Sequence, residues 1–154
     1  MAIEVSNLSV SDREEWEGLY RGYADFYQVP MTKKILDQVW SWIFDSEQPF
    51  YALIAKDANG VALGIMHYRQ MASPLRGAMV GFLDDLYVLP GCRGTGIVDA
   101  LFDALKVSAK QHGWPFVRWI TADNNYRGRG VYDKLAERTP WITYQMPTDN
   151  QLLT

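Results

Sequence analysis

"VGFLDDLYVLPGCRGTGIVDALFDAL", residues 80–105, joins a β-branched and aromatic run to a glycine-rich loop and then to an amphipathic helical pattern. The loop contains three glycines, Gly91, Gly94 and Gly96, and Arg93 stands among them. A strand followed by glycines and a helix leaves backbone N–H groups free at the start of the helix, where they can bind an anion. This stretch therefore predicts either a phosphate-binding loop or a turn that only redirects the chain.

Two familiar phosphate-binding motifs fit the loop poorly. A P-loop carries Lys and then Ser or Thr after its last glycine, whereas Ile97 and Val98 stand at those positions. A dinucleotide-binding fingerprint follows the first strand of a repeated βαβ unit, whereas the strand before this loop is predicted to be the fourth of the chain. The rest of the sequence has to decide what the loop does.

The composition is that of a globular protein with a slight acidic excess. The 154 residues are 48% hydrophobic and 21% charged, and the formal net charge is −3. The length suits one domain, and the acidic balance argues against a nucleic-acid-binding protein, which normally has a basic face. The single cysteine, Cys92, excludes a disulfide framework and a multi-cysteine zinc site, so we expect no metal. No apolar run approaches the roughly 20 residues of a membrane span, and we therefore expect a cytoplasmic protein that does not bind membranes.

Residue spacing and turn residues predict ten elements along the chain. Asp57, Asn59 and Gly60 predict a hairpin turn, Thr32 and Gly113 predict a helix start and a helix end, and Pro30 ends the first helix. The predicted elements are strand 2–8, helices 9–29 and 31–45, strands 49–57, 61–70 and 79–88, helix 97–112, strand 115–123, helix 125–137 and strand 139–146. This order predicts a single α/β domain over residues 1–154, with a mixed sheet and helices on both of its faces.

The glycine loop resembles the acetyl-CoA-binding segment of the GNAT superfamily of N-acetyltransferases. In that family, a strand is followed by an Arg or Gln-x-x-Gly-x-Gly or Ala pattern that opens a helix. Residues 93–98, RGTGIV, follow this pattern, except that Val98 stands where the family has Gly or Ala. The resemblance implies that the loop holds a phosphate group.

A second segment, ADNNYRGRGVYDKLA at residues 122–136, resembles a late motif of the same family. In that motif an Asn precedes, by seven positions, a Tyr on the following helix, and Asn125 and Tyr132 have this spacing. Gly128 stands where a small residue is usual, whereas Ala136 stands where the family often has Gly. The resemblance covers nearly the whole chain and implies the GNAT fold, whose sheet is splayed beside the strand that precedes the glycine loop.

The resemblance also implies site residues. Asn125 and the strand and loop residues would bind acetyl-CoA, Tyr132 would protonate the departing thiolate, and Asp84 would be the general base. The strand and loop residues implied in binding are Leu86, Tyr87, Val88, Arg93, Gly94, Thr95, Gly96, Ile97 and Val98. An alternative is that Asp84 and its neighbour Asp85, which strand alternation places on the opposite face, are only a solvated pair at the strand end or partners in salt bridges.

Other residues near the predicted cleft have two possible interpretations. His67 could face the cleft, but a structural histidine with satisfied hydrogen bonds is the better interpretation. The aromatic residues of helix 9–29 recur at helical spacing, which is typical of a core, although in GNAT proteins the first two helices wall the acceptor cleft. Together with Asp25, some of these rings could receive a cationic amine.

The resemblance implies an N-acetyltransferase that transfers the acetyl group of acetyl-CoA to a primary amine. The acidic composition favours a small, cationic acceptor, polyamine-like or amino-acid-like. A protein or peptide acetyltransferase is one alternative, and a non-catalytic acyl-CoA sensor is another. The tyrosine at the family position argues against the sensor, because a binding module has no need of a proton donor. The family resemblance also makes a homodimer an expectation.

Overall fold

The computed structural model describes residues 2–152, which fall into two compact units divided between Trp119 and Ile120. The first unit contains a five-stranded sheet and three helices, and the second contains one helix followed by a chain without regular structure. The elements of the first unit are β1 (Glu4–Asn7), α1 (Arg13–Tyr27), α2 (Lys33–Phe44), β2 (Phe50–Lys56), β3 (Ala62–Ser73), β4 (Ala78–Val88), α3 (Ile97–His112) and β5 (Val117–Trp119). The helix of the second unit is α4 (Tyr126–Leu135).

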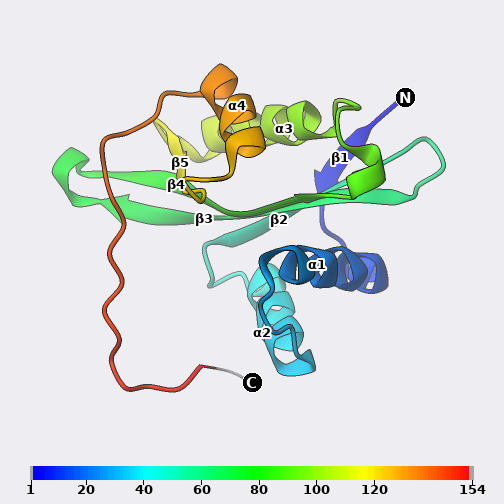
Figure 1. The fold of residues 1–154 in the computed structure, drawn as a ribbon, viewed down its shortest axis with the longest axis horizontal. Coiled ribbons are helices and arrows are strands. Elements are labelled where there is room, and N and C mark those ends of the chain that lie inside the picture. The colour runs from blue at the N-terminus through cyan, green and yellow to red at the C-terminus, as the bar shows by residue number, and fades with distance from the viewer. Residues whose placement is uncertain (1, 153–154) are drawn as a thin grey trace. The chain divides into compact units, whose positions relative to one another are not determined.

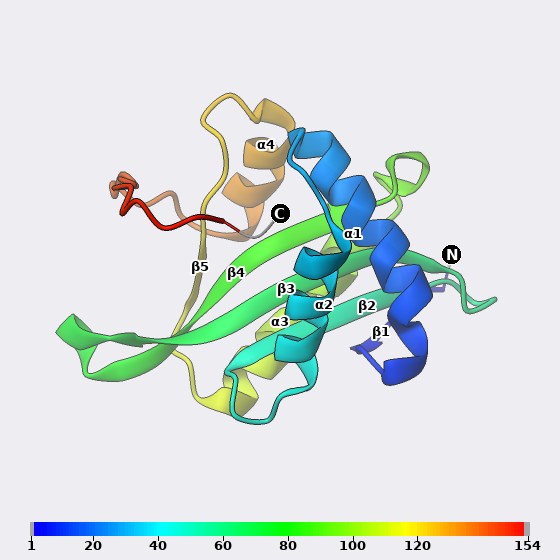
Figure 2. The same ribbon diagram turned by 90° about the horizontal axis from the view of Figure 1, so that it is seen from below.

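The sheet of the first unit has the order β1-β2-β3-β4-β5. The first four strands pair antiparallel, and β5 pairs parallel to β4. Figure 1 shows α1 and α2 on one face of this sheet and α3 on the other, and Figure 2 shows α1 and α2 crossing the strands. The mixed sheet with helices on both faces, as predicted from the sequence, is confirmed.

Local sequence signals place most of the element boundaries. The carboxylate of Asp57 accepts hydrogen bonds from the backbone N–H groups of Asn59 and Val61, which closes the β2–β3 hairpin. The hydroxyl of Thr32 accepts a hydrogen bond from the N–H of Ile35 and caps α2. Gly113 ends α3 with a φ of +75°, a conformation that favours glycine.

A hydrophobic core fills the space between the sheet and the α1/α2 layer. Trp16 and Leu36 of the two helices are completely buried against Ile54 and Ile65 of the central strands. Apolar residues recur along α1 and α2 every three or four positions, so that one face of each helix is buried while its charged face meets water. This packing holds α1 and α2 against the sheet surface that bears the site described below.

Among the described residues, no strand pairs with the second half of β4 on the side of β5, and this side is called its free edge below. The parallel pairing with β5 begins at Gly81 and ends at Leu83, and β5 itself ends at Trp119. On its other side β4 remains paired with β3 as far as Val88. The sheet is therefore splayed beside residues 84–88, as the family resemblance implies.

The second unit differs from the prediction in its last strand. Residues 139–146 form no strand, and Trp141, Ile142 and Tyr144 are mostly exposed, Tyr144 to 91%. A strand needs a neighbour to satisfy its backbone hydrogen bonds, and within residues 2–152 none pairs with this segment. The prediction of strand 139–146 was wrong for this reason, and strand 115–123 is likewise reduced to the three residues that pair with β4.

Candidate active site

The glycine loop ends at the N-terminus of α3 with the backbone geometry that an anion site requires. Gly94 and Gly96 have φ values of +79° and +88°, and Gly96 is the residue that caps the helix. A Cβ atom at either glycine would meet no other atom within 4 Å, so the space above the loop is open. The first N–H groups of a helix have no acceptor within the helix, and the helix dipole favours a negative charge there.

The remaining loop residues are held by the protein. The hydroxyl of Thr95 donates a hydrogen bond to the carbonyl of Cys92, which tightens the turn before the helix. Ile97 is buried and anchors the helix start in the core, whereas Val98 is only half-buried. The guanidinium of Arg93 lies over the ring of Phe26, 5.5 Å from its centroid, beside the loop. The loop is therefore an ordered structure that presents backbone N–H groups.

The strand residues implied in acetyl-CoA binding lie on the free edge of β4. Leu86, Tyr87 and Val88 pair with β3 on one side, and no strand among the described residues pairs with them on the other. In an antiparallel pair, alternate residues turn their N–H and C=O groups away from the partner strand. This segment therefore has backbone groups available to hydrogen-bond an extended ligand.

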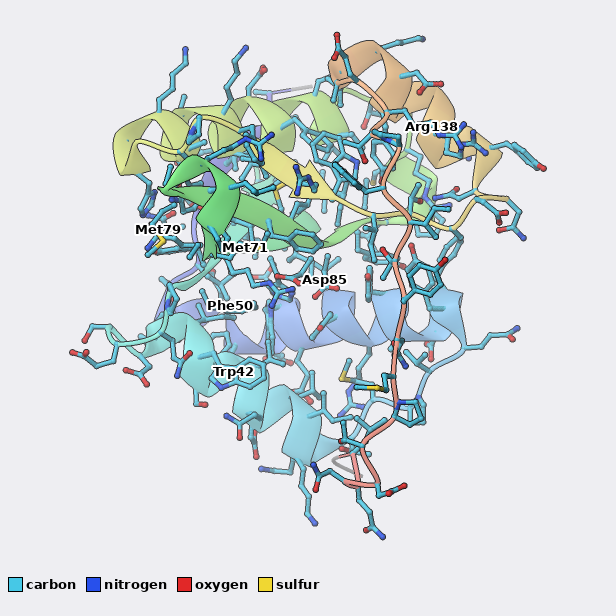
Figure 3. The ribbon with its side chains drawn as sticks, turned by 90° about the vertical axis from the view of Figure 1, so that its left-hand side faces the viewer. Trp42, Phe50, Met71, Met79, Asp85 and Arg138 are labelled. Atoms are coloured by element: carbon cyan, nitrogen blue, oxygen red, sulfur yellow. The ribbon has the colours of Figure 1, made fainter. Side chains whose placement is uncertain are left out.

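A cavity of about 530 Å³ opens between the sheet and the α1/α2 layer. Figure 3 shows Trp42 on α2 and, between the helices and the sheet, Phe50 of β2 and Asp85 of β4. The cavity is lined by Tyr20, Val39, Trp42, Gln48, Pro49, Phe50, Arg69, Gln70, Asp84 and Asp85. It combines aromatic rings with two carboxylates and one guanidinium, which suits a small polar ligand.

Asp84 and Asp85 both line this cavity, which corrects the prediction that they point to opposite faces. The register between β3 and β4 shifts there, because His67 faces Asp85 while Tyr68 faces Leu83. Asp84 is thus the extra residue of a β-bulge, and a bulge interrupts the strict alternation of a strand. The sequence shows no signal for this bulge, since strand periodicity alone predicts alternation.

The carboxyl of Asp84 lies in an electrostatically unusual place. Its Oδ1 is 3.2 Å from a guanidinium nitrogen of Arg69, whereas its Oδ2 is buried without a hydrogen-bond partner among residues 2–152. Burial raises the pKa of Asp84 to about 6, since the charge of Arg69 offsets only part of the effect and Asp85 adds to it. A carboxyl with a raised pKa and an unpaired oxygen in a cavity is typical of a proton-transfer group.

Asp85 is held by a network of buried side chains. Its Oδ2 lies 2.8 Å from the Nδ1 of His67 and accepts a hydrogen bond from the hydroxyl of Tyr20, also at 2.8 Å. The indole N–H of Trp16 donates to the Nε2 of His67 at 2.8 Å. Because an indole nitrogen can only donate, His67 must accept at Nε2 and carry its proton on Nδ1, from which it donates to Asp85.

The hydrogen bonds of this network keep Asp85 ionised. Burial alone would raise the pKa of Asp85, but the hydrogen bonds donated by His67 and two tyrosines outweigh it and place the pKa below its usual value. Burial, together with the charge of Asp85, raises the pKa of Tyr20, which therefore stays protonated and donates. His67 is fully buried with both ring nitrogens bonded, which confirms that it is a structural histidine.

The other predicted cleft residues divide between core and surface. Trp16 lies in the core and Tyr20 lines the cavity, but Tyr27 is exposed. Asp25 is also exposed and does not line the cavity, because it lies on the solvent face of α1.

The aromatic lining of the cavity comes instead from Trp42 of α2 and Phe50 of β2, together with Tyr20. Sequence reasoning missed Trp42, Phe50 and Arg69, although Arg69 follows His67 by two positions on the same strand and so shares its face.

Asn125 and Tyr132 lie in the second unit. Asn125 caps α4: its side-chain oxygen accepts the N–H of Gly128 at 3.2 Å, and its amide donates to the hydroxyl of Thr121 at 2.9 Å. A Cβ atom at Gly128 would come within 2.5 Å of the Asn125 amide, which explains the small residue there. Tyr132 lies on α4 seven positions after Asn125, or about two helical turns.

The described part of the chain holds no group of three or more His, Cys, Asp or Glu side chains that could bind a metal ion. Among residues 2–152, no helix has both the length and the apolar character needed to cross a bilayer.

The chain is similar over most of its length to known acetyltransferases. The model of the acetyltransferase (GNAT) family matches residues 16–136. The chain is 26% identical over 144 residues to the D-amino-acid N-acetyltransferase of Saccharomyces cerevisiae, a match that covers 93% of this chain and 89% of the relative.

Solved structures at lower identity share the fold. The ribosomal-protein-alanine N-acetyltransferase from Brucella melitensis is 24% identical with a TM-score of 0.79, and the match covers 96% of this chain and all of that one. AAC(6')-Iy in complex with the bisubstrate analogue CoA-S-monomethyl-acetylneamine is 20% identical with a TM-score of 0.82, again over 96% of this chain and all of that one.

Proposed function

Because this chain belongs to the acetyltransferase (GNAT) family and is an acetyl-CoA-dependent N-acetyltransferase, we propose that its acceptor is a small, positively charged primary amine that binds in the cavity beside Asp84. The observation that carries this proposal is the buried, unpaired carboxylate oxygen of Asp84 in that cavity. An amine is the complementary group, since it can donate a hydrogen bond to this oxygen and give up a proton to it.

The charges and rings of the cavity favour a cation. Two carboxylates, Asp84 and Asp85, face the single guanidinium of Arg69, so the lining has a net charge of about −1 when His67 is neutral. The rings of Tyr20, Trp42 and Phe50 line the cavity, and aromatic rings can attract an ammonium group.

The loop and strand residues fit acetyl-CoA. We propose that the backbone of residues 94–98 binds the pyrophosphate, because Gly94 and Gly96 leave open space over a helix N-terminus. The free edge of β4 at residues 86–88 would hydrogen-bond the pantetheine arm, and Asn125 would contact it as the family resemblance implies. Arg93 adds a positive charge beside the loop. When bound, acetyl-CoA supplies the acetyl group as a thioester, whose C–S bond breaks as the C–N bond to the amine forms.

Two side chains are proposed to move protons. Asp84 accepts the proton that the amine nitrogen loses, directly or through a water molecule, and its raised pKa of about 6 makes it a better acceptor than an ordinary aspartate. Tyr132 gives its hydroxyl proton to the leaving sulfur. This role for Tyr132 is supported by its spacing from Asn125 and by the family resemblance. We propose, as the family resemblance implies, that the whole chain works as one acetyltransferase domain.

One observation favours amino acids as a second acceptor class. Arg69 lines the cavity with half of its side chain exposed, so its guanidinium has donors left for a carboxylate. The relative from Saccharomyces cerevisiae is named as a D-amino-acid N-acetyltransferase, which supports including D-amino acids among the candidates. A homodimer and a cytoplasmic location stay predictions from the family resemblance and the composition.

The test is a screen of acceptors with acetyl-CoA that measures thiol release. It includes a polyamine, a monoamine, neutral and acidic amino acids of both hands, and a lysine-containing peptide. We expect the highest kcat/KM for cationic small amines, with a decrease as salt screens the attraction. Equal turnover of acidic acceptors would contradict the electrostatic argument, and preferred turnover of the peptide would favour a protein substrate. Binding of acetyl-CoA without turnover of any acceptor would favour the sensor.

A further inference from the structure

From the geometry of the β4 bulge we infer that Asp85 is a positioning residue for acetyl transfer, one that directs the Asp84 carboxyl into the cavity and supplies the negative charge beside it. The inference rests on the proposed role of Asp84 as the proton acceptor. Asp85 itself is not proposed to exchange a proton with the substrate.

The positions of the flanking residues explain why Asp84 is the extra residue. Asp85 is directed toward α1, where its carboxylate meets the hydroxyl of Tyr20, and it pairs across the sheet with His67. Leu83 is buried and pairs with Tyr68, whose hydroxyl bonds to Ser108 of α3 on the opposite face. Regular alternation would place residues 83 and 85 on one face, so holding them on opposite faces requires an irregular residue between them. The hydrogen bonds of Asp85 thus define the bulge that presents Asp84.

The negative charge of Asp85 is not cancelled by its partners. The indole N–H of Trp16 donates a hydrogen bond to the Nε2 of His67. Protonation of this Nε2 would therefore place two N–H donors against each other. His67 therefore bonds to Asp85 as a neutral ring, and the tyrosine hydroxyl is neutral too. The network consequently holds a net negative charge next to Asp84.

The other groups that face Asp84 come from three elements. Strand β3 contributes the guanidinium of Arg69 and the ring of His67, β4 contributes Asp85, and α1 contributes the hydroxyl of Tyr20. Helix α2 and strand β2 line the cavity with uncharged side chains only, among the residues described. Asp85 is thus the one anionic neighbour in this lining, and it raises the pKa of Asp84 while Arg69 lowers it.

The experiment replaces the charge of Asp85 but keeps its shape. In Asp85→Asn, the side-chain oxygen can still accept from His67, so the bulge should persist. Without the neighbouring negative charge, Asp84 should ionise more easily, and the acid limb of the kcat/KM profile should move to lower pH by about one pH unit. This is the size of effect that a nearby like charge has on the pKa of a carboxyl. Asp103→Asn is the matched control, since it removes an exposed carboxylate of α3 on the other face of the sheet and should leave the profile in place.

A second measurement separates this inference from the role of Asp84 in catalysis. The Asp84 carboxyl is titrated by carbon NMR in the protein without substrate, with Asp84→Asn used to assign the signal. In Asp85→Asn its titration should move to lower pH by the same amount as the kinetic limb. If Asp84→Asn keeps full activity, the proposed base is wrong, but the NMR titration still tests the effect of Asp85.

A folded Asp85→Asn variant with unchanged kinetic and NMR titrations would overturn the inference and leave Asp85 a structural residue. If this variant does not fold, Asp85→Ser removes the same charge and leaves a smaller side chain whose hydroxyl oxygen can accept from His67. The Asp84 titration should then also move to lower pH, and its failure to move would overturn the inference.

Discussion

Asp84→Asn should make the protein more stable and less active at the same time. In the folded protein, the pKa of Asp84 is raised from 3.8 to about 6, because its charged form is buried beside Asp85. The folded and unfolded pKa values thus differ by about two units, which corresponds to about 3 kcal/mol. Near pH 8, where Asp84 is ionised, the folded state is destabilised by about this amount. Asparagine does not ionise and therefore avoids this cost.

The attraction between Arg69 and the ionised carboxylate is already contained in this net pKa. One effect reduces the expected gain: about a quarter of the Asp84 side chain still meets water, and solvent screens its charge. We therefore expect a gain of about 1–2 kcal/mol at pH 8. For a protein of this size that corresponds to a rise in Tm of about 3–6 °C.

The gain should depend on pH in a defined direction. A carboxyl whose pKa is raised by folding contributes stability that is present below its unfolded pKa and is lost as pH rises through its folded pKa. For Asp84 this window runs from about pH 4 to about pH 6. The variant should thus gain little at pH 4 and reach its full advantage above pH 7.

Thermal unfolding followed by circular dichroism at pH 4 and pH 8 measures this difference, and thiol release at pH 8 measures activity. We expect turnover to fall by about a hundredfold or more, the range of general acid–base contributions. Asp37→Asn is the control: it removes an exposed carboxylate whose pKa is lowered by Lys33 and Arg13, so it should not raise Tm at pH 8. A lower Tm for Asp84→Asn at pH 8, an equal gain at both pH values, or full turnover would refute the reasoning.

Three further substitutions test the loop, the acid and a helix cap. Gly96→Asp should weaken CoA binding, measured by calorimetry, at least about tenfold. Gly77→Asp is the control: it also places a side chain at a positive φ, so it should lower Tm, but it should not change CoA affinity. Tyr132→Phe should lower turnover at least about tenfold with CoA affinity unchanged, and unchanged turnover under conditions where chemistry limits the rate would contradict its role as an acid. Thr32→Ala removes the cap of α2 and should cost about 1 kcal/mol in urea unfolding, with no loss if the hydrogen bond to the helix contributes nothing.

Much of the fold could be predicted because its signals are local. The turn at Asp57, the cap at Thr32 and the positive φ of Gly113 each depend on a few neighbouring residues, and the structure confirms all three. The strand at residues 139–146 could not be predicted in this way. Its β-branched and aromatic residues suit a strand, but a strand exists only where another strand accepts its hydrogen bonds.

The sequence by itself determined the order of the helices and the first five strands and the glycine loop at the start of α3, since propensity, periodicity and turn chemistry act over short distances. Only the tertiary structure decided which side chains share the cavity. Trp42, Phe50 and Arg69 come from three elements that meet through packing, and Asp84 joins Asp85 in the cavity because the buried bonds of Asp85 interrupt the strand. Strand periodicity assigns adjacent residues to opposite faces, and a bulge set by long-range contacts with α1 overrides it.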